Sequence, residues 1–281
     1  MNSALQIGPL TFPWPLVVVI AAVAAASFVG RRFGGSTQVD ADPQLFRTLL
    51  VAVVVARLAF VVLFFEAYRS SPWSIFDIRD GGWRPLPGLL AAWLYALWMG
   101  LRVRPVRRSL WSALAGATLV WVAGSLILIS MAPASTPLPA INLAALDGRQ
   151  VSLQQFAGKP TVVNLWATWC PPCRREMPVL ASAQAEHPDV HFVFLNQGET
   201  AAKVESYLNA EKLALVNVLL DAKGEASGKF SQRALPTTLF FDANGTLVDS
   251  RVGELSLATL TERLRGIQVS PLSNSTPSKA P

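Results

Sequence analysis

Four long apolar stretches separated by arginine-bearing loops fill the first half of the chain, over residues 14–30, 49–65, 86–101 and 110–131. A helix needs about 20 apolar residues to cross the hydrocarbon core of a bilayer. The third stretch is short, so its flanking residues have to help it to span. The pattern predicts an α-helical membrane domain with four spans over residues 1–131.

The first stretch begins after two prolines and is followed by Arg31 and Arg32. A cleaved signal peptide carries its basic residues before the apolar run rather than after it. We therefore expect residues 14–30 to remain in the protein as a membrane helix.

From residue 141 onward, short apolar runs typical of strands alternate with helical segments. A hairpin is expected over residues 141–153, with its turn at Asp147–Gly148. Further strands are expected at 161–166, 190–196, 216–220, 237–241 and 246–251, and helices at 171–185, 200–212, 225–230 and 256–265. This order predicts an α/β domain with a central mixed sheet flanked by helices, over residues 141–267.

Two proline-containing segments flank the predicted α/β domain. Residues 132–140 read APASTPLPA, which predicts a short, semi-rigid linker because proline-rich chains are stiff and extended. Residues 268–281 are rich in serine and proline and are expected to form a disordered tail.

Composition supports a membrane protein, since 52% of the residues are hydrophobic and only 15% are charged. The net charge of +6 comes from residues 1–131, which hold 11 arginines against 5 acidic residues. Arginines in the loops between apolar stretches orient membrane helices. We therefore interpret the positive charge as a topology signal and expect no nucleic-acid partner.

The loop arginines predict which side of the membrane each segment faces. Residues 31–47 and 102–108 hold seven arginines, residues 1–30 hold none, and residues 66–84 hold three. Arginine-rich loops stay in the cytoplasm. With four crossings, both termini and the α/β domain are expected on the opposite side.

Both cysteines of the chain lie in the sequence Trp-Cys-Pro-Pro-Cys, at Cys170 and Cys173. An apolar strand leads to Cys170, and the prolines suit the first turn of a helix that leads away from it. At such a helix N-terminus, free backbone N–H groups and the helix dipole lower the pKa of a thiol. We predict that Cys170 is the nucleophile and that Cys173, one turn further on, is the resolving thiol that closes a disulfide with it.

Metal and haem sites are alternative interpretations of the cysteine pair. The spacing of a zinc site is met by Cys170, Cys173, His187 and His191. A zinc finger needs both histidines on one helix face, whereas Pro188–Asp189 ends the helix between them. Covalent haem needs histidine directly after the second cysteine, and Arg174 stands there. We expect neither a metal nor a cofactor.

The segment Trp-Ala-Thr-Trp-Cys-Pro-Pro-Cys-Arg-Arg-Glu-Met-Pro, at residues 166–178, resembles the TlpA/ResA-type membrane-anchored branch of the thioredoxin family. The resemblance extends over about residues 137–267 and includes Gly158-Lys159-Pro160, Leu235-Pro236-Thr237-Thr238 and Gly253. It implies a thioredoxin fold and a protein-disulfide reductase of the periplasmic side of the bacterial inner membrane.

The same resemblance assigns roles to residues outside the cysteine pair. It implies that Glu176 assists proton transfer at Cys173, because Asn164 stands where thioredoxin itself has a buried aspartate. It also implies a cis peptide bond before Pro236 and pairing of the Leu235 backbone with a substrate peptide. The substrate-contacting residues that it implies are Trp169, Pro171, Pro172, Leu235 and Pro236.

A second resemblance lies in the apolar half of the chain. Residues 56–60 (ARLAF), 78–83 (IRDGGW) and 88–90 (GLL) are similar to part of the prolipoprotein diacylglyceryl transferases. That family has a histidine shortly after the paired glycines, and none occurs here before His187. Arg57 lies within an apolar stretch, where arginine is costly and usually faces a partner or an aqueous cavity.

The expected function is reduction of disulfides in extracytoplasmic proteins. Because the predicted spans contain no cysteine, a separate membrane protein of thiol-relay type would have to supply the electrons. Two alternatives remain open: a disulfide oxidase or isomerase that uses the same cysteines, and a lipid-binding or lipid-transferase-like membrane protein that uses Arg57.

Overall fold

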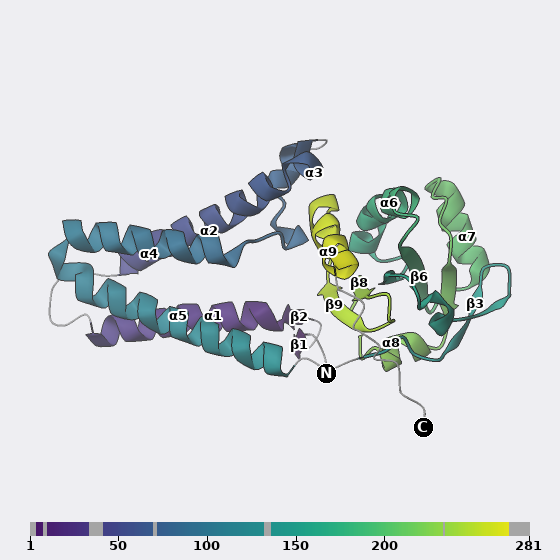
Figure 1. Cartoon of the computed structure of the whole chain (residues 1–281), viewed down its shortest axis with the longest axis horizontal. Helices are drawn as coiled ribbons and strands as arrows, with labels where there is room; N and C mark the ends of the chain where they lie inside the picture. The colour runs from purple at the N-terminus through teal and green to yellow at the C-terminus, as the bar shows by residue number, and fades with distance from the viewer. Residues whose placement is uncertain are drawn as a thin grey trace, which may run out of the picture. The chain divides into compact units, whose positions relative to one another are not determined.

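The computed structural model describes residues 4–7, 10–33, 42–69, 72–131, 136–232 and 234–269. The chain divides into two compact units, Ala4–Ala132 and Pro133–Pro281 (Figure 1). The expected tail from residue 270 onward and residues 132–135 of the expected linker lie outside the described residues.

Long helices dominate the first unit: α1 (Trp14–Phe33), α2 (Asp42–Leu63), α4 (Pro85–Arg102) and α5 (Arg107–Ser130). Helix α1 packs along α5, and α2 packs along α4 (Figure 1). Within the described residues, three segments are long and apolar enough to cross a membrane: Trp14–Arg32, Pro43–Leu63 and Arg104–Ser130. The third expected span, residues 86–101, coincides with α4, which has 18 residues and a length of about 27 Å.

Small residues allow the paired helices of this unit to approach closely. A Cβ atom at Gly88 of α4 would lie 2.6 Å from the carbonyl oxygen of Ala52 in α2. A Cβ atom at Gly124 of α5 would lie 2.7 Å from a methyl group of Val18 in α1. In a membrane, apolar burial does not drive helices together, because the lipid tails are as apolar as the side chains. Helices there associate through close backbone packing at small residues of this kind.

Short elements complete the first unit. An antiparallel pair, β1 (Ala4–Ile7) and β2 (Leu10–Pro13), precedes α1; the apolar pattern does not predict it. Helix α2 begins at Asp42 rather than at residue 49, because Asp42-Pro43 is a favourable helix start. Between the helices lie α3 (Phe65–Arg69), η1 (Pro72–Phe76), η2 (Ile78–Asp80) and η3 (Arg104–Val106).

The second unit is built on one mixed sheet, with seven strands in the order β4-β3-β7-β6-β5-β8-β9 among the described residues. Strands β5, β6 and β7 are parallel to one another and the others pair antiparallel. The strands are β3 (Asn142–Ala145), β4 (Gln150–Ser152), β5 (Thr161–Trp166), β6 (His191–Gln197), β7 (Val218–Asp221), β8 (Thr237–Phe241) and β9 (Leu247–Val252).

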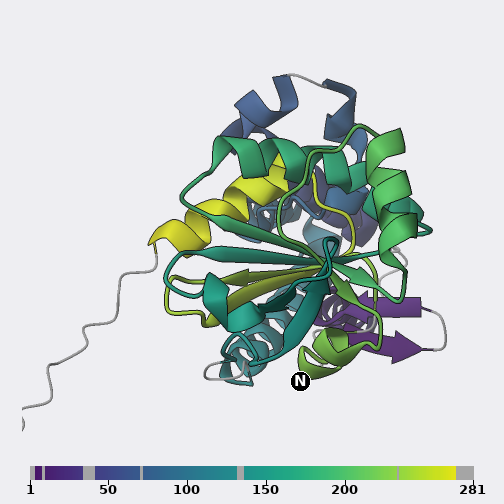
Figure 2. The ribbon, with the colours of Figure 1, turned by 90° about the vertical axis from the view of Figure 1, so that its right-hand side faces the viewer.

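Helices cover both faces of this sheet (Figure 2). They are α6 (Pro171–Glu186), α7 (Ala201–Ala210), α8 (Glu225–Lys229) and α9 (Leu257–Val269), with the short η4 (Leu153–Phe156). Apolar side chains of α6, α7 and α9 form a core on one face, and those of α8 and η4 pack on the other. All six residues of the central strand β5 are therefore buried, as its uninterrupted apolar run requires.

The sequence predicts the type and order of these elements correctly. Strands 161–166 and 237–241 agree with β5 and β8, and the other strands and helices differ by a few residues at their ends. Helix α9 extends to Val269, beyond the expected end at residue 265. The second unit is a thioredoxin-like mixed sheet flanked by helices.

Candidate functional site: a disulfide at a helix N-terminus

Strand β5 and helix α6 place the first cysteine at the start of the helix. Cys170 is the N-cap residue of α6, with an extended backbone (φ −89°, ψ 107°), and prolines occupy the first turn. The Cys173 backbone N–H donates to Cys170 Sγ over 3.3 Å. The sulfur therefore lies at the positive end of the helix dipole, beside the Cys173 backbone N–H, which has no carbonyl partner within the helix.

Cys170 and Cys173 form a disulfide. The Cys173 side chain is fully buried, whereas Cys170, although only 3% exposed, borders a pocket. A substrate sulfur that enters this pocket reaches Cys170 and not Cys173.

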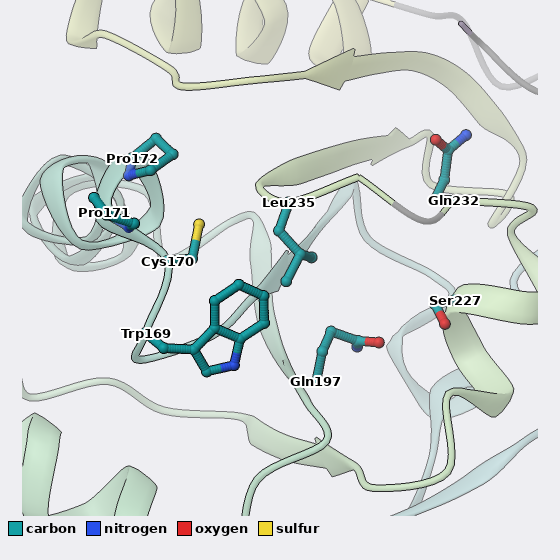
Figure 3. Close-up of a pocket in the computed structure, with 8 residues that line it drawn as sticks. All are labelled: Trp169, Cys170, Pro171, Pro172, Gln197, Ser227, Gln232 and Leu235. Carbon is teal, nitrogen blue, oxygen red and sulfur yellow. The ribbon is translucent and has the colours of Figure 1, made fainter. Parts of the chain in front are cut away.

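The pocket has a volume of about 460 Å³, and Trp169, Cys170, Pro171, Pro172, Gln197, Ser227, Gln232 and Leu235 line it (Figure 3). The structure thus gathers most of the expected substrate-contacting residues around the sulfur. The Trp169 side chain is prominent among them, because 63% of this residue is exposed. The Leu235–Pro236 peptide bond is cis, as the family resemblance implies, but Pro236 itself is not among the lining residues.

One wall of the pocket is polar, and the sequence does not reveal it. Gln197 comes from the end of β6, Ser227 from α8, and Gln232 from the segment before the cis peptide bond. Nothing in their local sequence marks them, because only the fold brings these three segments together. Of the described lining residues, none apart from Cys170 carries an ionisable side chain, so the pocket favours uncharged groups.

Glu176 lies one turn beyond Cys173, on the same side of α6, and is fully buried. Its Oε1 accepts a hydrogen bond from Asn164 Nδ2 over 2.8 Å, and its Oε2 accepts one from the Leu255 backbone N–H over 2.9 Å. Burial raises the pKa of Glu176 to about 8, although these two hydrogen bonds favour the ionised form. The carboxyl group therefore carries a proton at pH 7 and can release it at a modest energetic cost.

Asn164, in the middle of β5, connects Glu176 to the strand that follows the cis peptide bond. Its Nδ2 also donates to Thr238 Oγ1 over 3.0 Å, while its Oδ1 is buried without a hydrogen-bond partner among the described residues. Asn164 therefore connects the acid on α6 to strand β8 through its amide nitrogen.

Trp166 is completely buried in the same apolar core as both cysteines, with its ring 5.6 Å from that of Tyr207. The two histidines are separated, as the sequence predicts. His187 is the C-cap of α6 and His191 begins β6. In the described part of the chain, no group of three or more His, Cys, Asp or Glu side chains could hold a metal ion.

The sequence also gives no indication of Glu199, which lies between β6 and α7. Its carboxylate accepts hydrogen bonds from the backbone N–H and the hydroxyl group of Thr168, both over 2.7 Å. Thr168 lies in the connection that leads from β5 to Cys170. Glu199 therefore contacts the site from a segment about 30 residues further along the chain.

In the first unit, Arg57 is buried in α2 and all three of its side-chain nitrogens donate hydrogen bonds. It pairs with the buried Asp80 over 2.9 Å, and Tyr68 and the Gly82 backbone N–H also donate to that carboxylate. Its other acceptors are the carbonyl oxygens of Ser74, Ile75, Asp77 and Gly82. Arg57 thus holds the connection between α2 and α4 in place.

The fold and the site together define a thioredoxin-fold protein. Its Cys-Pro-Pro-Cys disulfide is of the kind found at redox-active sites. Comparison with known proteins agrees. Residues 133–263 match the Redoxin family, and residues 2–128 match the prolipoprotein diacylglyceryl transferase family. The thioredoxin-like protein YneN of Bacillus subtilis is 32% identical over 130 residues, which cover 45% of this chain and 75% of that protein.

The thiol-disulfide oxidoreductase ResA of Bacillus thuringiensis is 29% identical over 131 residues, which cover 46% of this chain and 75% of that protein. A solved structure of MTB dsbF is 28% identical, with a TM-score of 0.42, and covers 46% of this chain and 95% of that one. The chain belongs to the thioredoxin-like thiol-disulfide oxidoreductases, and its N-terminal region is related in sequence to the diacylglyceryl transferases.

Proposed function

We propose that the protein is a membrane-anchored reductase of disulfides in extracytoplasmic proteins. The observation that carries this proposal is the pairing of Cys170, at the N-terminus of α6 and beside a pocket, with a buried Cys173 and a buried Glu176. In this proposal, Cys170 attacks the substrate disulfide and Cys173 releases the substrate. Glu176 accepts the proton of Cys173.

In the reduced protein, the Cys170 thiolate attacks one sulfur of a substrate disulfide. A mixed disulfide forms and the other substrate sulfur leaves as a thiolate. Cys173 then loses its proton to the Glu176 carboxylate and attacks Cys170 Sγ, which releases the second substrate thiolate. The substrate has gained two electrons, the Cys170–Cys173 disulfide has formed, and Glu176 is left protonated, in keeping with its raised pKa of about 8 in the disulfide form.

The pocket supports a peptide substrate. Trp169 and Leu235 offer apolar contacts beside Cys170, and Gln197 and Ser227 offer hydrogen-bonding groups further along the pocket (Figure 3). An extended peptide that pairs with the Leu235 backbone would bring its cysteine to Cys170. Because the lining is uncharged, we expect neutral residues beside the substrate cysteine.

Regeneration requires an outside electron donor. The chain has only two cysteines, so its membrane helices carry no thiol that could relay electrons. We infer a separate membrane protein that presents a reduced dithiol to the Cys170–Cys173 disulfide on the periplasmic side of the bacterial inner membrane.

The membrane unit serves, in this proposal, as a four-span anchor made of α1, α2, α4 and α5. Helix α4, at about 27 Å, nearly matches the roughly 30 Å hydrocarbon core. The hydrogen bonds of Arg57 to Asp80 and the backbone of residues 74–82 support a structural role for this arginine rather than a role in lipid transfer.

Substrate capture tests the proposed reaction. In full-length protein with Cys173→Ala, the second step is blocked, so Cys170 should accumulate mixed disulfides with extracytoplasmic proteins, visible on non-reducing gels and released by dithiothreitol. The matched control, Cys170→Ala, keeps one thiol but should capture nothing, because Cys173 is buried. Equal capture by both variants, or capture by neither, would contradict the mechanism.

A further inference from the structure

The connection between β5 and α6 determines where the Cys170 sulfur lies. Only Ala167, Thr168 and Trp169 separate the end of β5 from Cys170. The Cys170 backbone N–H donates to the Ala167 carbonyl oxygen over 3.2 Å, which closes a tight turn around Thr168. A shift of Thr168 therefore moves Cys170 relative to the first turn of α6.

Glu199 fixes this turn from the connection between β6 and α7. The Thr168 backbone N–H donates to Glu199 Oε2 and the Thr168 hydroxyl group donates to Oε1. The carboxylate therefore binds Thr168 through two hydrogen bonds. Asn196 Nδ2 donates to Oε2 over 2.8 Å, and Lys203 Nζ lies 2.7 Å from Oε1. The Glu199 side chain is 4% exposed, and buried hydrogen bonds to a charged group are strong and directional.

The carboxylate is ionised at neutral pH. Burial alone would raise its pKa, but hydrogen bonds from Lys203, Thr168 and Asn196 outweigh burial and lower the pKa to about 2. Lys203 offsets the negative charge at contact distance, so the field that Glu199 exerts on more distant groups is small. Its influence on Cys170 is then geometric.

We propose that Glu199 is a positioning residue of the thiol–disulfide site, which holds the Thr168 turn so that the Cys170 sulfur stays aligned with the N-terminus of α6. This proposal rests on the proposed role of Cys170 as the attacking thiol. Without the hydrogen bonds from Thr168 to Glu199, the turn relaxes and the Cys170 thiolate loses its contact with the Cys173 backbone N–H.

Glu199→Gln could change the pKa of the Cys170 thiol in two ways, and these have opposite signs. The direction of the change therefore distinguishes them. Removal of a negative charge, acting only through space, would make the Cys170 thiol more acidic. Release of the turn would make the thiol less acidic, because the thiolate loses the Cys173 N–H donor that stabilises it. A residue that contributes only to folding stability would leave the acidity of the thiol unchanged.

The experiment measures the rate of Cys170 alkylation by iodoacetamide against pH, in the full-length protein with Cys173→Ala as parent. Adding Glu199→Gln should move the midpoint upward by about one pH unit, with alkylation up to about tenfold slower at pH values below the parent's midpoint. The control Glu205→Gln removes an exposed negative charge from α7 and should leave the midpoint in place. An unchanged or lowered midpoint in Glu199→Gln would overturn the proposal.

A milder pair of variants covers the case in which Glu199→Gln does not fold. Thr168→Val loses the hydroxyl donor but keeps the backbone N–H, and Thr168→Ser keeps both. The valine variant should raise the midpoint and the serine variant should not; equal midpoints would overturn the proposal. If the parent itself shows a Cys170 thiol no more acidic than free cysteine, the proposed function fails instead.

Discussion

At the residue scale, the proposed mechanism assigns three tasks to three side chains at the start of α6. Cys170 borders the pocket, Cys173 is buried behind it, and Glu176 lies buried a turn further along α6. Asn164 donates a hydrogen bond to Glu176 but carries no charge, so it does not form an ion pair with the carboxylate. In the proposed mechanism, Glu176 accepts the proton of Cys173 and then stays protonated in the disulfide form, in keeping with its raised pKa of about 8.

The raised pKa of Glu176 predicts a pH dependence of stability. The unfolded chain releases this proton near the ordinary value of 4.5, whereas the folded disulfide form keeps it until about pH 8. The folded state binds more protons over this range, so its stability falls as the pH rises from 4.5 to 8. Relative to Glu176→Gln, which does not titrate, the oxidised wild-type protein should lose roughly 2–4 kcal/mol over that range.

Thermal unfolding of both oxidised proteins at pH 5 and pH 8.5 checks this expectation. The difference in melting temperature should shift in favour of the glutamine variant at the higher pH. A difference that stays constant between the two pH values would show that Glu176 is not a titrating group in this range.

At the element scale, the connection between α2 and α4 is organised by a buried ion pair. Arg57 and Asp80 are 9% and 5% exposed at their side chains, and Arg57 also binds several backbone carbonyl groups of this connection. Loss of one partner of such a pair leaves the other charged and buried without compensation. The network therefore stabilises the whole helix connection.

Arg57→Leu should destabilise the protein by about 3–5 kcal/mol, measured as thermal or denaturant unfolding in detergent. Arg69→Leu is the matched control. It breaks the ion pair with Glu66. The side chains of Arg69 and Glu66 are 71% and 82% exposed, and exposed pairs contribute about 0–1 kcal/mol to stability. Similar losses in both variants would contradict the structural role given to Arg57.

The sequence predicts the elements that depend on a local pattern. Three local patterns show this. The apolar run of β5 indicates a buried strand, the prolines after Cys170 indicate a helix start, and Asp-Gly at residues 147–148 indicates a hairpin turn. The polar wall of the pocket, with Gln197 and Ser227, and the Glu199–Thr168 contact cannot be predicted in this way. They join segments far apart in the chain, and no residue among them is marked by its local sequence.

At the scale of the whole molecule, the chain combines an apolar helical unit with a thiol–disulfide unit, each related to a different family. The arginine-rich loops at residues 31–47 and 102–108 place the second unit outside the cytoplasm if all four helices cross. An oxidisable dithiol suits that compartment, because cytosolic thiols are kept reduced.

Protease treatment of intact spheroplasts tests this topology. With four crossings, externally added protease should digest the second unit, which a C-terminal epitope reports, while a cytoplasmic marker protein survives. Protection of the epitope until the cells are lysed would place the unit in the cytoplasm, as three crossings would.

The direction of electron flow is the central claim, and the reduction potential of the Cys170–Cys173 pair tests it most directly. The full-length protein is equilibrated with glutathione or dithiothreitol buffers, and the fraction of reduced pair is measured by thiol alkylation. A reductase should give a potential near about −270 mV, as in thioredoxin. A potential near about −120 mV, as in a strong disulfide oxidant, would contradict the account.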